Sequence, residues 1–173
     1  MKVIDCYLSL LQQWDKELGG NSIFLPTQFL RIRVDMKEIV TFSKSKELNM
    51  ETKFVLAPIL INDNHWVMVI VDIKKECLNF FNSMGGPWAQ ECNIICDWLH
   101  LLLPTVTWST NIMSQTIRDF PLQTGNTTEC GIFVMMYADY FLEDLVMNFT
   151  LRDMPHFRIK IFADIFRGRL KYV

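Results

Sequence analysis

The chain has 173 residues, of which 50% are hydrophobic and 21% charged, and its formal net charge is −2. This balance excludes an intrinsically disordered chain, and the absence of a basic run gives no support to a nucleic-acid partner. The length predicts one domain, covering 1–173, that buries roughly two-thirds of its unfolded surface. The longest apolar runs, such as WVMVIV, are too short to cross a bilayer and predict no membrane partner.

Cysteine usage predicts the compartment. The five cysteines are an odd number without regular spacing, in a chain large enough to fold without disulfides. We therefore expect reduced thiols and a location in the nucleus or cytoplasm. The N-terminal stretch MKVIDCYLSLLQQWD contains Asp5 and lacks a small-residue cleavage site, which predicts that it is not a signal peptide.

The first half of the chain predicts one helix followed by strands. Apolar residues recur at helical spacing over 3–16, and ELGGNS then ends the pattern. The segment 24–41 is ambiguous. The stretch that reads PIL, HWVMVIVD and ECLNFFN predicts strands separated by turns, because it is rich in β-branched and aromatic residues.

The second half predicts mainly helices. WAQECNIICDWLHLLL predicts a helix that ends before Pro104, and TVTWSTNI predicts another strand. A helical pattern begins at Cys130, and a last helix is predicted from Pro155 to Leu170, with Gly168 a weak point near its end. Helices at both ends around central antiparallel strands predict an α+β fold.

Cys130 is the candidate nucleophile. It follows a polar, turn-forming run and opens the helical pattern, and a helix N-terminus lowers the pKa of a thiol. The other four cysteines lie within apolar elements, where inert packing is expected. On placement alone, a small core residue at an element boundary is still the commoner role for a cysteine.

His65 is the best candidate base among three histidines. His100 lies late in a predicted helix, and His156 lies at the start of the last one. His65 opens the strand HWVMVIVD directly after the turn residues NDN. A lone histidine at a strand edge is usually structural or solvated. A catalytic role for His65 therefore depends on which residues lie next to it.

The hairpin that begins at His65 supplies a partner. A turn at Ile73–Lys74 would set His65 opposite Asn82 on the same face, although a slip of one residue would turn Asn82 away. Asp72 is excluded as the orienting group, since seven residues along the strand it points to the other face, roughly 20 Å away.

A cysteine, a histidine and an asparagine are a known catalytic set, and acyl transfer also needs donors to the developing oxyanion. The histidine takes the thiol proton, and the amide fixes the ring tautomer. The backbone N–H of Cys130 and the side-chain amide of Gln123 are candidate donors to the developing oxyanion. A loop glutamine considered alone is more often solvated surface.

Three sequence blocks together resemble the catalytic domain of the Ulp/SENP family of SUMO-specific cysteine proteases. They are HWVMVIVDIKKECLNFFNSMGG, PLQTGNTTECGIFVMMYADY and NFTLRDMPHFR, in the family's order. The resemblance implies a papain-like α+β fold, with a central antiparallel-rich sheet flanked by helices. It also implies cleavage after the Gly-Gly terminus of SUMO or a related ubiquitin-like modifier, or of its protein conjugates.

Matched position by position, the resemblance makes Cys130 the nucleophile, His65 the base and Gln123 the oxyanion donor. Trp66 matches the tryptophan that covers the narrow diglycine tunnel. The resemblance implies no cofactor and no metal.

The sequence departs from the family pattern in three places. Asn82 stands where the family usually has Asp, so the imidazolium is expected to gain no neighbouring charge. The loop from Gln123 to Cys130 is one residue longer than usual. The chain also begins inside the family's first conserved helix, which predicts a fragment or a short form with a more open tunnel.

Two alternatives follow from the same residues. The departures are compatible with a module of the same fold that binds a modifier but has lost useful turnover. Cys92, Cys96 and His100 recur every four residues on one helical face, as metal ligands could. A structural zinc site usually gathers four ligands from several elements, and the interleaved apolar residues favour a packed helix instead.

Overall fold

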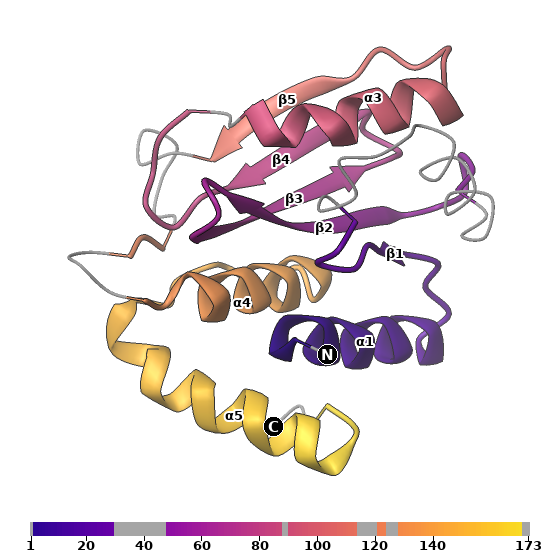
Figure 1. Cartoon of the computed structure of the whole chain (residues 1–173). Coiled ribbons are helices and arrows are strands. Elements are labelled where there is room, and N and C mark those ends of the chain that lie inside the picture. The colour runs from indigo at the N-terminus through magenta and orange to yellow at the C-terminus, as the bar shows by residue number, and fades with distance from the viewer. Residues whose placement is uncertain (1, 30–47, 88–89, 114–120, 124–127, 171–173) are drawn as a thin grey trace.

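A computed structural model describes residues 2–29, 48–87, 90–113, 121–123 and 128–170 (Figure 1). The helices and strands, in chain order, are α1 (Val3–Glu17), β1 (Ile23–Phe24), β2 (Phe54–Ile61), β3 (His65–Asp72), β4 (Cys77–Phe81), α3 (Asn93–Leu102), β5 (Ser109–Met113), α4 (Cys130–Leu142) and α5 (Met154–Arg167). Short 3-10 turns at Gln90–Cys92 and Leu151–Asp153 precede α3 and α5.

The strands form one five-stranded sheet in the order β1-β2-β3-β4-β5. The three central strands are antiparallel, and each edge strand pairs in parallel with its neighbour. The prediction of an antiparallel-rich centre is therefore confirmed. The segment that was ambiguous contains the end of β1, and its residues from 30 on lie outside the described part of the chain.

A tight turn places His65 at the first position of β3. Ile61 pairs with His65, so only three residues connect β2 to β3. Asn62 and Asp63 adopt positive φ values of 48° and 56°, a conformation that these residue types tolerate better than most. The turn sequence NDN therefore fixes where the strand and its histidine begin.

The turn between β3 and β4 is longer than predicted. Asp72 pairs with Cys77, so the turn has four residues rather than the two at Ile73–Lys74. Its geometry has a local cause: the Asp72 carboxylate accepts the backbone N–H of Lys75 at 3.0 Å and pairs with its ammonium group at 3.0 Å. The predicted register was wrong by two residues.

This error leaves the face of Asn82 unchanged, because side chains alternate with a period of two along a strand. In the observed register Met68 lies opposite Phe81. Asn82, one residue beyond β4, therefore approaches His65 diagonally instead of directly opposite.

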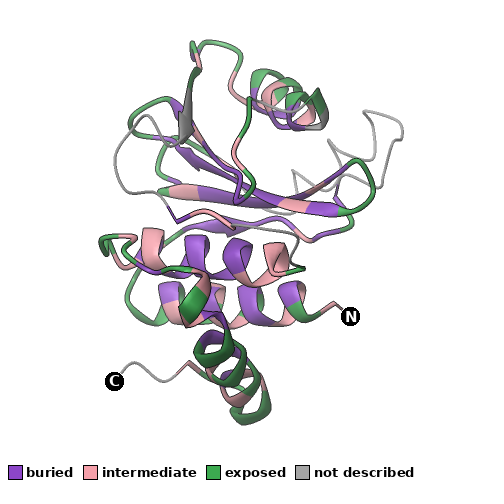
Figure 2. Ribbon diagram, turned by 90° about the vertical axis from the view of Figure 1, so that its left-hand side faces the viewer, coloured by how far each residue is buried: buried purple, intermediate pink, exposed green. Residues whose placement is uncertain are grey.

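Helices cover both faces of the sheet (Figures 1 and 2). On one face α4 lies between the sheet and α1, with α5 outermost, and the side chains of α4 are buried nearly all round. On the other face α3 buries Ile95, Trp98 and Leu99 against the strands. The position of α4 at the centre of the molecule fixes Cys130, its first residue, at the end of the sheet.

Buried polar contacts join the three helices on the α4 side. Tyr7 donates to Asp139 at 2.8 Å, and the Lys160 ammonium lies 3.1 Å from Asp139 and 3.2 Å from Asp164. Asp164 also accepts from Arg167 at 2.9 Å. Asp139 and Asp164 thus each have a cationic partner, the condition under which a buried charge is tolerated.

Two predicted helix boundaries need correction. The helix predicted over WAQECNIICDWLHLLL begins only at Asn93, after the 3-10 turn Gln90–Cys92. The last helix ends at Arg167, not at Leu170, because Gly168 takes a left-handed φ of 67° and caps the helix. Within the described part of the chain, none of the helices combines the length and the apolar character needed to span a membrane.

Candidate active site

Cys130 is half-buried at the first position of α4. Burial by itself raises the pKa of its thiol. A hydrogen bond to His65, the charge of that ring and the backbone N–H groups of Trp66 and Gly131 outweigh this effect and lower the pKa below its ordinary value. Only the Gly131 N–H among these groups belongs to the start of α4, so the helix start is one contribution among several.

The residue before the cysteine anchors the start of α4. The Glu129 carbonyl accepts the N–H groups of Ile132 and Phe133, and its carboxylate binds Arg158 of α5 through two contacts of 2.8 and 2.7 Å. The N–H of Cys130 belongs to the first turn of α4, and the N–H groups of a first turn have no acceptor inside the helix. It can serve as a donor to a developing oxyanion.

His65 is buried and lies between Cys130 and Asn82. Its Nε2 is 2.8 Å from Asn82 Oδ1, and the other ring nitrogen serves the bond to the thiol. Burial opposes the charged ring, but the hydrogen bonds to Cys130 and Asn82 and the charge of the thiolate raise the pKa of His65 above its ordinary value.

Asn82 places an acceptor oxygen beside the His65 ring. Its Oδ1 accepts the backbone N–H of Met84 at 3.0 Å, which keeps the oxygen end of the amide directed at the ring. The His65 Nε2 must therefore carry a proton, leaving Nδ1 to accept the thiol proton. The opposite pKa shifts of Cys130 and His65 favour a thiolate beside an imidazolium.

We expect Asn82→Asp to move the alkaline limb of the rate profile upward. A carboxylate beside Nε2 raises the pKa of His65, so the imidazolium persists to higher pH. Asn82→Ala removes the acceptor, releases the ring and lowers the rate by about ten-fold, part of what general acid–base catalysis contributes. The measurement is the pH dependence of turnover and of Cys130 alkylation.

Asn93→Asp is a matched control, because it makes the same chemical change at an exposed position on α3. It should leave both profiles unchanged. If the wild type, Asn82→Ala and Asn82→Asp gave coincident profiles, Asn82 would not orient the base.

Gln123 lies beside the residue that follows Asn82. Its backbone N–H donates to the Ser83 carbonyl at 2.6 Å, and its Oε1 accepts from Ser83 Oγ at 3.4 Å. The structure therefore brings Gln123 to the same end of β4 as the orienting amide. The predicted extra loop residue before Cys130 falls in a stretch that includes 124–127, outside the described residues.

Trp66 follows the base on β3. Its ring is half-buried against the hydrophobic core, and the Lys2 ammonium lies 4.6 Å from the ring centroid, within the range of a cation–π contact. Its backbone N–H faces the thiol. Trp66 therefore contributes a backbone donor that the sequence analysis did not anticipate.

The alternative metal ligands do not come together as a site. Cys92 is buried in the core, and burial together with the charge of Asp97 raises the pKa of Cys96. His100 is exposed, and its Nδ1 contacts the Cys96 carbonyl at 2.8 Å. Among the described residues, no three His, Cys, Asp or Glu side chains are grouped as metal ligands would be.

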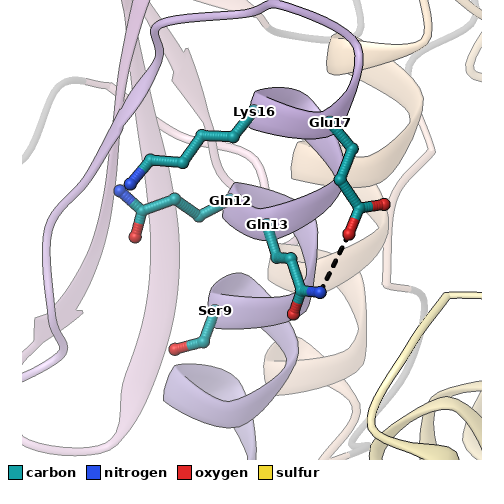
Figure 3. A pocket seen from close by; sticks show the side chains of 5 residues that line it. All are labelled: Ser9, Gln12, Gln13, Lys16 and Glu17. Atoms are coloured by element: carbon teal, nitrogen blue, oxygen red, sulfur yellow. Dashed lines mark hydrogen bonds between the residues drawn. The ribbon is translucent and has the colours of Figure 1, made fainter.

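A separate hollow lies on the outer side of α1 (Figure 3). It is lined by Ser9, Gln12, Gln13, Lys16 and Glu17, and Gln13 donates to Glu17 at 2.9 Å. All five side chains come from one helix, and none pairs a nucleophile with a base. The chemistry therefore belongs to the Cys130 end of the sheet.

A thiol on a helix and an imidazole on a strand, held in this relation, are the working pair of papain-type cysteine peptidases, the class that this fold and site define. The model of the Ulp1 protease family, C-terminal catalytic domain, matches residues 1–171. The chain belongs to the Ulp1 protease family.

Individual relatives agree with this assignment. Sentrin-specific protease 2 of Homo sapiens is 28% identical over 179 residues, covering 98% of this chain and 30% of the relative. Putative ubiquitin-like-specific protease 1B of Arabidopsis thaliana is 36% identical over 129 residues, covering 69% of this chain and 36% of the relative. The chain thus spans only about a third of the length of these relatives.

The solved structures confirm the predicted fold. SUMO protease Ulp1 with its catalytic cysteine oxidized to a sulfinic acid has a TM-score of 0.77 at 22% identity, covering 98% of this chain and 77% of that one. The Chaetomium thermophilum Ulp1-like SUMO protease catalytic domain has a TM-score of 0.75 at 14% identity, covering 98% of this chain and 71% of that one. The α+β architecture is therefore that of the Ulp1 catalytic domain.

Proposed function

We propose that this chain is a thiol peptidase and isopeptidase that cleaves after the C-terminal Gly-Gly of SUMO or a related ubiquitin-like modifier. The observation that carries the proposal is the contact between Cys130 and His65, whose pKa values are shifted in opposite directions. Family membership supports the substrate class, since a Ulp1 protease domain has been solved in complex with Smt3, the yeast ortholog of SUMO.

In the first step, the Cys130 sulfur attacks the carbonyl carbon of the last glycine. A carbon–sulfur bond forms, and the carbonyl electron pair moves to oxygen. The Cys130 N–H and the Gln123 amide donate hydrogen bonds to the resulting oxyanion. His65 holds the thiol proton and transfers it to the departing amine as the carbon–nitrogen bond breaks. The modifier remains attached as a thioester.

In the second step, water hydrolyses the thioester. His65, now neutral, takes a proton from the water, and the resulting hydroxide adds to the carbonyl carbon at the same oxyanion site. The carbon–sulfur bond then breaks, and the modifier leaves with a free carboxylate. Asn82 keeps the ring in place through both steps by holding Nε2.

Access to the site determines the substrate. In this proposal Trp66 forms the flat cover of a narrow channel that admits glycine but no larger side chain. Its half-buried ring packs against the core and lies 4.6 Å, centroid to Nζ, from the Lys2 ammonium. The partners are then a diglycine-ended modifier and its conjugates, met in the nucleus or cytoplasm, and no cofactor takes part.

The test is incubation with a panel of diglycine-ended modifiers whose C-terminal carboxylate is replaced by a vinyl sulfone. We expect a stable thioether on Cys130 with one modifier or one group of modifiers, because only a bound modifier presents the electrophile to the thiolate. Intact-mass measurement and peptide mapping identify both the modifier and the cysteine.

The main alternative is a module that binds a modifier without useful turnover. The amide of Asn82 is the feature that favours this alternative, since it adds no negative charge beside the imidazolium. Such a module would hold one modifier tightly and release it uncut, without forming an adduct. Labelling of another cysteine would contradict the assignment of the nucleophile.

A further inference from the structure

Ser83 connects the two supporting groups of the site. It directly follows Asn82, the residue is only 1% exposed, and its carbonyl and its hydroxyl both contact Gln123. The Ser83 carbonyl accepts the Gln123 backbone N–H at 2.6 Å, and Ser83 Oγ donates to Gln123 Oε1 at 3.4 Å. One short turn therefore holds the base through Asn82 and contacts the glutamine through Ser83.

The contact with the Ser83 hydroxyl orients the side-chain amide of Gln123. A glutamine side chain ends in an acceptor oxygen and a donor nitrogen, and only the donor can stabilise an oxyanion. A hydroxyl hydrogen directed at Oε1 favours the rotamer in which oxygen faces Ser83, so Nε2 occupies the opposite end. At 3.4 Å the bond is long, as catalytic hydrogen bonds often are before substrate binds.

We propose that Ser83 is a positioning residue that holds the donor end of the Gln123 amide toward the oxyanion. The inference rests on the proposed function, in which Gln123 is an oxyanion donor. It goes beyond that function by assigning a role to a buried hydroxyl that touches neither the thiol nor the imidazole in any of the contacts given above.

Two reactions of Cys130 separate this role from activation of the thiol. Iodoacetamide alkylates the thiolate by displacing iodide and develops no oxyanion. A peptide aldehyde ending in glycyl-glycinal accepts the sulfur at its carbonyl carbon, and its oxygen becomes the oxyanion, which takes up a proton to give a reversible hemithioacetal. Only the aldehyde requires Gln123.

We expect Ser83→Ala to raise the inhibition constant of the aldehyde about ten-fold, less than the 100-fold to 1000-fold effect of deleting an oxyanion donor outright. The rate of iodoacetamide alkylation and its pH profile should stay within two-fold of wild type. In a Gln123→Ala background, Ser83→Ala should change nothing further, because the group that it positions is gone.

Ser22→Ala is the matched control. Ser22 is buried at 3% exposure, and its hydroxyl has no hydrogen-bond partner among the described residues, so its removal should affect neither reaction. The inference is overturned if Ser83→Ala binds the aldehyde like wild type, slows alkylation equally, or acts as strongly without Gln123.

The same experiment keeps the two proposals apart. A wild-type protein that binds the aldehyde in a Ser83-dependent way but cuts no modifier would overturn the proposed function and leave the role of Ser83 intact. A wild-type protein that is alkylated but does not bind the aldehyde would overturn both.

Discussion

Cys130→Ser should abolish hydrolysis of modifier substrates, with a loss on the order of 10⁴-fold or more, as for other deleted nucleophiles. Oxygen and sulfur differ little in size, so the fold should survive. A serine hydroxyl is far less acidic than a thiol, and His65 with two backbone N–H groups cannot hold it as an anion at neutral pH. Turnover is measured with a diglycine-linked modifier fusion, and folding by thermal unfolding.

Cys96→Ser is the matched control for this change. Cys96 is also half-buried, but burial and Asp97 raise the pKa of its thiol, so it should be unreactive and dispensable. Limiting iodoacetamide at neutral pH should accordingly label Cys130 first. Retention of most hydrolysis by Cys130→Ser would refute the assignment.

Trp66→Ala should lower the cleavage rate of modifier substrates about 100-fold, the scale of loss that a small misplacement of substrate causes. The variant deletes the indole but keeps the backbone N–H that faces the Cys130 sulfur. Alkylation of Cys130 by iodoacetamide should therefore stay close to wild type, while kcat/KM for the modifier falls.

Trp14→Ala serves as the control, because it removes a half-buried indole that packs against the same hydrophobic core from α1. It should cost similar stability without the selective loss of modifier cleavage. A wild-type protein that cleaved diglycine and bulkier C-termini equally well would rule out a narrow channel under Trp66.

The element pattern was predictable because it depends on local sequence. The apolar spacing of α1, the NDN turn before His65 and the polar run before Cys130 each lie within a few residues of the feature that they specify. The pairing of β3 with β4 was not predictable to the residue. Its four-residue turn depends on the contacts between Asp72 and Lys75, which a count of turn residues does not reveal.

The candidate site divides in the same way. Cys130, His65 and Asn82 were proposed from residue type and placement, and the structure brings the three side chains together, because the two-residue error in register preserved the face. The Trp66 N–H toward the thiol and the Ser83 hydroxyl toward Gln123 were missed. Both contacts exist only because distant segments pack together, and no periodicity encodes that.

The placement of Cys130 on a helix and His65 on a strand of the facing sheet has a consequence for folding. Of the groups that lower the thiol pKa, α4 itself supplies only the Gly131 N–H, whereas His65 and the Trp66 N–H belong to β3, so the Cys130–His65 pair forms only when the two layers dock. Such contacts between distant parts of the chain form late and slowly compared with local ones. The Cys130 thiol of a newly synthesised chain is therefore less reactive until α4 packs on the sheet. The alkylation rate of Cys130 at neutral pH consequently reports the docking of α4.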